Sequence, residues 1–159
     1  MTATAEGTLD LPASPRSVPV ARRHARRTAR EAGLPEDTSD VLHLLVSELV
    51  TNAVVHARTD VRLHIVVTPD EVRVEVCDQA GLHPRLRTHS SSATTGRGLR
   101  LLSALASSWG VEELDAGGKM VWAVLPVDSL HSDHALAERY ADVAGLLGDL
   151  GPEGEGRSA

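Results

Sequence analysis

The chain has 159 residues, which is enough for one domain with a sizeable buried core. Hydrophobic residues make up 42% and charged residues 24%, as in soluble globular domains, and no apolar run approaches the ~18 residues of a membrane span. The net charge of −6 argues against general nucleic-acid affinity, and the single cysteine, Cys77, excludes an internal disulfide. Because the N-terminus also lacks the basic-then-apolar order of a secretory signal, we expect a cytoplasmic protein.

The first predicted elements are a short strand and an arginine-rich helix. Residues 7–11 (GTLDL) predict an edge strand, and residues 17–34 predict a helix with Ser17 as N-cap, Pro19 in the first turn and Gly33 as the stop. The helix has only a modest apolar side. Its basic face is either simply solvated or a docking surface for an acidic partner. The arginines concerned are Arg22, Arg23, Arg26, Arg27 and Arg30.

A second helix and a hairpin follow. Residues 38–56 have the 3.6-residue apolar period of a core helix. The period then changes to two over residues 61–67 (VRLHIVV) and 71–76 (EVRVEV), with Pro69 in the tight turn between them. Because the alternate positions are polar, we expect one face of this sheet to be wet.

The rest of the chain predicts a long polar loop, a helix, a second hairpin and a tail. Residues 78–96 lack periodic structure, and the apolar period of a helix resumes at residue 99. Residues 110–114 and 119–126 predict strands joined by a glycine-rich turn, with Trp109 and Trp122 as core residues. The order of elements predicts an α+β two-layer sandwich, a mostly antiparallel sheet with helices on one face.

The stretch SELVTNAVVHA carries polar side chains at three successive fourth positions, Glu48, Asn52 and His56. Four residues advance an α-helix by about 400°, so these side chains are expected nearly in line, each ~6 Å above the last. Burying an unpaired Glu costs several kcal/mol. The strip must therefore face water, a partner or a ligand, unless its members simply bond one another at the helix boundary.

Two further motifs stand near this helix in chain order. Asp78 directly follows a strand, where it either forms a turn or accepts a hydrogen bond from an exocyclic amine. Gly96 and Gly98 precede a helix, where they either end the loop or open an anion site of backbone N–H groups. Neither a P-loop nor a dinucleotide-binding motif is present. Cys77 is expected as a small packed residue, with a position beside a bound base as the alternative.

Taken in this order, the three motifs resemble the ATP-binding fold shared by histidine kinases, gyrase-type ATPases and the Hsp90 chaperone. The closest likeness is to the small serine kinases that act as anti-sigma factors. LLVSELVTNAVVHA resembles their asparagine box, VEVCDQAGLHPR their first glycine box, and GRGLRLLSALASSWGVE with GGKMVWAVLP their second box and closing hairpin. The resemblance covers residues 8–127 as one domain, and leaves residues 128–159 as a C-terminal helix (about 133–150) and a disordered tail.

The resemblance implies ATP and Mg²⁺ as cofactors and a role for each motif residue. Asn52 would supply an oxygen ligand to Mg²⁺, Glu48 would be the general base, and Asp78 would accept from the adenine amine. His56 would border the triphosphate. The family's first box has a glycine two residues after the Asp, where this chain has Ala80 followed by Gly81. The phosphates would be cradled at the start of the next helix by Gly96, Arg97, Gly98 and Leu99.

The implied function is that of an ATP- and Mg²⁺-dependent protein-serine kinase of the anti-sigma type, which binds a sigma factor and phosphorylates an antagonist protein. The alternative is a non-catalytic ATP-binding protein that sequesters a partner. Direct nucleic-acid binding through the arginine-rich helix is disfavoured by the net charge and by the aromatic content of 2%. Dimers are common in the family, so a homodimer through a sheet edge or the first helix stays open.

Overall fold

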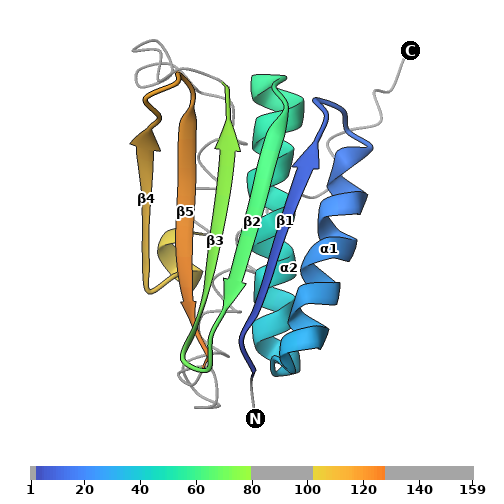
Figure 1. Ribbon diagram of the computed structural model, residues 1–159, viewed down its shortest axis with the longest axis vertical. Helices are drawn as coiled ribbons and strands as arrows, with labels where there is room; N and C mark the ends of the chain where they lie inside the picture. The colour runs from blue at the N-terminus through green and yellow to red at the C-terminus, as the bar shows by residue number, and fades with distance from the viewer. Residues whose placement is uncertain (1–2, 80–101, 128–159) are drawn as a thin grey trace, which may run out of the picture.

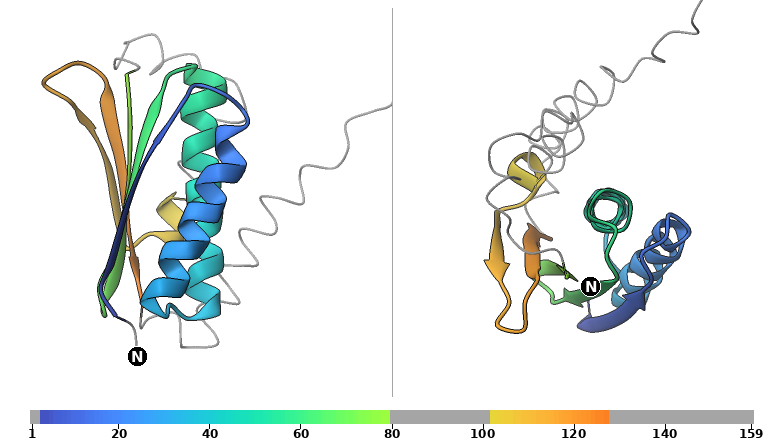
Figure 2. Two further views of the ribbon diagram at one scale, coloured as in Figure 1. Left: turned by 45° about the vertical axis from the view of Figure 1, so that its right-hand side comes forward. Right: turned by 90° about the horizontal axis from the view of Figure 1, so that it is seen from above.

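The computed structural model describes residues 3–79 and 102–127. These residues form two layers, a five-stranded sheet and two long helices that pack on one of its faces (Figures 1 and 2). Neighbouring strands all run antiparallel in the order β1-β2-β3-β5-β4, so the predicted α+β two-layer sandwich is confirmed. The elements are β1 (Ala5–Leu11), α1 (Ser17–Ala32), α2 (Glu36–Thr51), η1 (Asn52–Ala57), β2 (Val61–Val67), β3 (Glu71–Asp78), β4 (Ser108–Glu113) and β5 (Lys119–Pro126).

The two predicted hairpins are confirmed, and the alternate apolar side chains of the first hairpin contribute to the core. Every second residue of β2 and β3 is buried beneath the helices, where Leu63, Ile65 and Val74 are fully inaccessible. The β2–β3 turn closes through the Thr68 backbone N–H, which donates to the Glu71 carbonyl at 2.9 Å. A short helical stretch at residues 102–105 adds Leu102 and Leu105 to the same core.

The edge strand predicted near the N-terminus is also confirmed, since β1 lies at the end of the sheet and pairs only with β2 among the described strands. Helix α1 begins at Ser17, but this residue is not its N-cap. The Ser17 hydroxyl instead donates to the carbonyl of Pro12 at 2.7 Å, and Arg16 occupies the capping position without a side-chain bond. The stop at Gly33 is confirmed by its left-handed backbone, with φ of 65°.

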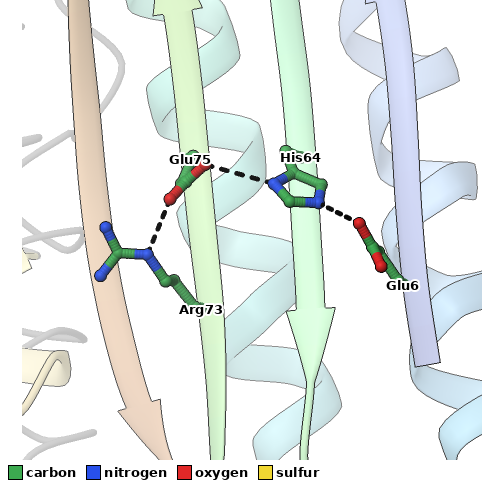
Figure 3. A network of polar contacts seen from close by, with 4 residues as sticks. All are labelled: Glu6, His64, Arg73 and Glu75. Carbon is green, nitrogen blue, oxygen red and sulfur yellow. Dashed lines mark hydrogen bonds and ion pairs between the residues drawn. The ribbon is translucent and has the colours of Figure 1, made fainter. Parts of the chain in front are cut away.

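The sheet face away from the helices is polar and cross-linked. His64 of β2 lies between Glu6 of β1 and Glu75 of β3, and Glu75 also accepts from Arg73 (Figure 3). Trp122 lies on this outer face, in register with Glu75, and the Arg73 guanidinium stands 4.7 Å from its ring centroid. The prediction that Trp122 is a core residue was therefore wrong.

Candidate functional site

The first part of the candidate site is the C-terminal end of α2. Glu48 and Asn52 are both half-exposed, whereas Leu49, Val50 and Ala53 between and beside them are buried. The backbone N–H of Asn52 bonds to the carbonyl of Glu48, so the two residues are one α-helical turn apart. Among the described residues neither side chain has a hydrogen bond or ion pair, which leaves a carboxylate and an amide side by side for a ligand.

The helix does not continue as an α-helix beyond Asn52. Residues Asn52–Ala57 form a π-helix, in which backbone bonds join residues five apart, and Arg58 ends it with a left-handed φ of 56°. Because one turn now takes more residues, position 56 is not directly above Asn52 as an α-helix would have placed it. The predicted alignment therefore holds for Glu48 and Asn52 but does not extend to position 56. Single π turns in helices are frequent at functional sites.

A clamp between the two helices fixes the residue just before Glu48. Arg22 of α1 donates to the hydroxyl of Ser47 through Nε at 2.9 Å and through Nη2 at 2.6 Å. The Thr51 hydroxyl donates to the Ser47 carbonyl at 2.6 Å. Hydrogen bonds from a charged group contribute roughly 1.5–3 kcal/mol each. The clamp therefore anchors the turn that carries Glu48, and sequence periodicity alone gave no sign of it.

The second part of the candidate site is the end of β3, where Asp78 lies on the helix-facing side and is 3% exposed. Its carboxylate pairs with Lys119 of β5, whose Nζ is 3.1 Å from Oδ2 and 3.3 Å from Oδ1. Figure 1 shows the end of β3, the start of β5 and the end of α2 at the same end of the molecule. Lys119 was not identified as a site residue from the sequence, because only the β3–β5 register pairs it with Asp78.

The β4–β5 turn brings Lys119 to this position. Gly117 and Gly118 have φ of 87° and 92°, which residues with a side chain rarely adopt. A Cβ on Gly118 would collide with the backbone carbonyl oxygen of Asp78, whereas one on Gly117 would meet nothing within 4 Å. The backbone of the turn is thus pressed against Asp78, so the ion pair sits in a closely packed frame.

An open hollow of about 640 Å³ lies at the same end of the sheet, but it is separate from these residues. It is lined by Asp10, Arg62, Cys77 and Gln79 among others, and does not include Glu48 or Asn52. Cys77 alternates with Asp78 and so belongs to the opposite face of the sheet, and burial is the main cause that raises the pKa of its thiol. This placement on opposite faces disfavours the alternative of Cys77 beside a base bound at Asp78.

The described side chains suit a magnesium–nucleotide complex. Within residues 3–79 and 102–127, no three His, Cys, Asp or Glu side chains form a group that could hold a metal ion by themselves. Mg²⁺ commonly takes one or two protein oxygens and completes its shell with phosphate oxygens and water. The half-exposed amide of Asn52 fits such a ligand, and the buried carboxylate of Asp78 fits a base with an amine.

Several predicted site residues lie outside the described residues, namely Gly81, Gly96, Arg97, Gly98 and Leu99. So do residues 80–96 of the loop predicted over residues 78–96, and the C-terminal segment 128–159. The backbone of His56 is part of η1, while its side chain is not described. The predicted roles of all these residues stay predictions.

Comparison with known protein families agrees with the fold. The model of the histidine kinase-like ATPase domain matches residues 11–125, from the end of β1 to the end of β5. The chain therefore belongs to the histidine kinase-like ATPase domain family, whose members bind ATP. Among curated proteins the chain has no match. Of the described helices, none has the length and hydrophobicity that a membrane crossing needs.

Proposed function

We propose that this protein is an ATP- and Mg²⁺-dependent protein-serine kinase of the anti-sigma type, which binds a sigma factor and phosphorylates a serine of an antagonist protein. The observation that carries the proposal is the pair Glu48 and Asn52, one helical turn apart, half-exposed and unbonded among the described side chains. Family membership supports the nucleotide, and the Glu48 carboxylate one turn before the Asn52 amide supports transfer to a hydroxyl.

Each residue has a separate task in this proposal. Asn52 contributes a neutral oxygen to Mg²⁺, which neutralises charge on the phosphates when the nucleotide is bound. Glu48 orients the attacking serine hydroxyl and accepts its proton. Asp78 accepts a hydrogen bond from the 6-amine of adenine. His56, Gly81, Gly96, Arg97, Gly98 and Leu99 are proposed to complete the nucleotide site.

Phosphoryl transfer depends mainly on positioning and electrostatics, so the rigidity of the turn that carries Glu48 matters. Ser47 is 7% exposed and is bonded by both Arg22 and Thr51. The clamp supports the proposal because it restrains the backbone next to the proposed base while the Glu48 side chain stays accessible.

The exposed arginines of α1 suit an acidic protein partner, which is the second of the two roles that the sequence left open for this helix.

The kinase step is tested with Glu48→Gln, which keeps the shape of the side chain and removes the base. Protein partners are first captured from native lysate with the wild-type chain, with and without Mg-ATP, and their phosphorylated serines are mapped. We expect E48Q to bind ATP as the wild type does and to phosphorylate the captured antagonist about 10²–10⁴ times more slowly.

Glu112→Gln is the matched control, because Glu112 is an exposed carboxylate on the outer side of β4. It should phosphorylate at the wild-type rate. Phosphorylation by E48Q at the wild-type rate would contradict the assignment of the base. If the wild-type chain captures a partner but does not phosphorylate it, the result would instead favour a non-catalytic protein that sequesters its partner.

A further inference from the structure

The pairing of Asp78 with Lys119 places a cation directly beside the buried carboxylate of the candidate site. The two residues are direct cross-strand neighbours in β3 and β5, and Glu113 of β4 is the next neighbour of Lys119 in the same row. Lys119 thus has a carboxylate on either side, and its ion pair is with Asp78, the buried one. The Lys119 side chain is 19% exposed, so it is largely buried and still partly accessible.

Lysine is rare in this chain, which makes its position informative. The 16 basic residues comprise one lysine, Lys119, and therefore 15 arginines. An ammonium is compact and has three donors, whereas a guanidinium is a broad planar fork. Beside the Asp78 carboxylate, the compact ammonium can hold Asp78 and keep an N–H donor for a second acceptor.

The pair offers a hydrogen-bond acceptor next to a donor. An ionised carboxylate only accepts, and it has about four lone-pair sites, so an ion pair with Lys119 is compatible with a further hydrogen bond to Asp78. The edge of adenine carries the complementary order, with the 6-amine as donor and the adjacent ring nitrogen N1 as acceptor. Guanine has the reverse order on that edge, a 6-oxo acceptor followed by an N1–H donor.

We propose that Lys119 is a specificity-determining residue of the nucleotide site, which donates to N1 of adenine while Asp78 accepts from the 6-amine. The inference rests on the proposed nucleotide site. In this arrangement the ion pair remains intact when the base binds, which matters because separating a buried carboxylate from its cation is strongly unfavourable. Lys119 therefore assists adenine binding and does not compete with it.

The test compares ATP with 1-deaza-ATP, in which a C–H group replaces N1 and the 6-amine is retained. Calorimetry of the wild-type chain should give at least about tenfold tighter binding of ATP, since a hydrogen bond from a charged donor is lost with the analogue. In Lys119→Met, which has a similar length and no charge, ATP affinity should fall and the two nucleotides should bind equally. Glu113→Gln, the matched control, should keep the wild-type ratio.

A second readout uses the wild-type protein alone. Lys119 is the only lysine side chain, so a small amine-reactive ester can modify only this residue and the N-terminal amine, and mass spectrometry separates the two. ATP should protect Lys119 from the ester, while 1-deaza-ATP at the same occupancy should protect it less.

Three results would overturn the inference. Tighter ATP binding by K119M would show that Lys119 competes with the base. Equal affinities of the wild-type chain for ATP and 1-deaza-ATP would show that N1 is not recognised. Either of these two results would leave the proposed function standing. If the wild-type chain binds neither nucleotide, the proposed function fails together with the inference.

Discussion

At the scale of single residues, His64 shows how a polar sheet face is held together. Its Nε2 lies 2.8 Å from Glu6 and its Nδ1 lies 3.2 Å from Glu75, so both ring nitrogens donate to carboxylates when the imidazole is protonated (Figure 3). Burial lowers the pKa of His64, but the two hydrogen bonds outweigh it and raise the pKa above 6.5. One protonated side chain thus connects three strands.

This network predicts a pH dependence of stability. A histidine with a raised pKa in the folded state contributes its full stabilisation below its unfolded pKa of 6.5 and loses it as pH rises through the folded pKa. Burial raises the pKa of Glu75, yet its bonds with Arg73 and His64 outweigh this and lower it below 4.5, so Glu75 stays ionised throughout that range. We expect the free energy of unfolding of the wild type, relative to His64→Gln, to fall from pH 6.5 upward in urea titrations.

His43 provides the matched control for this experiment. Burial, followed by repulsion from Arg26 and Arg22, lowers the pKa of His43 below 6.5, against a smaller opposing effect of Asp40. Its contribution therefore changes only below pH 6.5, and the difference between wild type and His43→Gln should be constant above it. A wild-type advantage over H64Q that is constant or grows with pH would refute the proposed role of His64.

At the scale of elements, the β4–β5 turn has little room for an added methyl group at one of its two glycines. Gly117→Ala and Gly118→Ala share the cost of a side chain at a positive φ, since both residues lie near 90°. Only Gly118→Ala places a Cβ against the backbone carbonyl of Asp78. The pair of variants therefore separates backbone strain from collision with the candidate site.

We expect G118A to lower the free energy of unfolding by about 1–3 kcal/mol more than G117A, as overpacking in a closely packed region does. Because the displaced backbone is that of Asp78, G118A should also weaken ATP binding more than G117A. Urea titration and calorimetry on both variants measure the two effects. Equal losses in the two variants would mean that the turn is not pressed against Asp78.

The junction of α2 and η1 is the other element that shapes the site. Thr51 bonds back to the Ser47 carbonyl, and the N–H of Asn52 is shared between the carbonyls of Glu48 and Leu49. Back-bonding of this kind bends helices, and the β-branched Val54 and Val55 are weak helix formers. These features favour a change of helix type at Asn52, which leaves the Glu48–Asn52 spacing intact.

At the scale of the whole molecule, the architecture could be predicted well from the sequence. The spacing of apolar residues, two in strands and 3.6 in helices, indicates which side of each element faces the core. β2 and β3 bury every second residue as predicted, and Gly33 ends α1. Trp122 was misassigned because the apolar run of β5 hides its alternation, in which Ala123 faces the core and Trp122 does not.

The candidate site was predicted less completely, for physical reasons. Glu48 and Asn52 are close in sequence and one turn apart, so local geometry sufficed to join them. The partner of Asp78 is 41 residues away, and only the β3–β5 register identifies it as Lys119. The π-helix was missed because apolar residues at Val50, Ala53 and Val54 are compatible with either helix type.

Calorimetric titration of ATP, with and without Mg²⁺, into the wild-type chain and into Asn52→Ala tests the proposed metal ligand most directly. We predict that Mg²⁺ strengthens ATP binding to the wild type, that N52A loses this gain, and that Asn52→Asp, which keeps an oxygen ligand, retains part of it. An N52A variant that binds Mg-ATP as tightly as the wild type would contradict the proposal that the Asn52 amide, at the junction of α2 and η1, holds the metal.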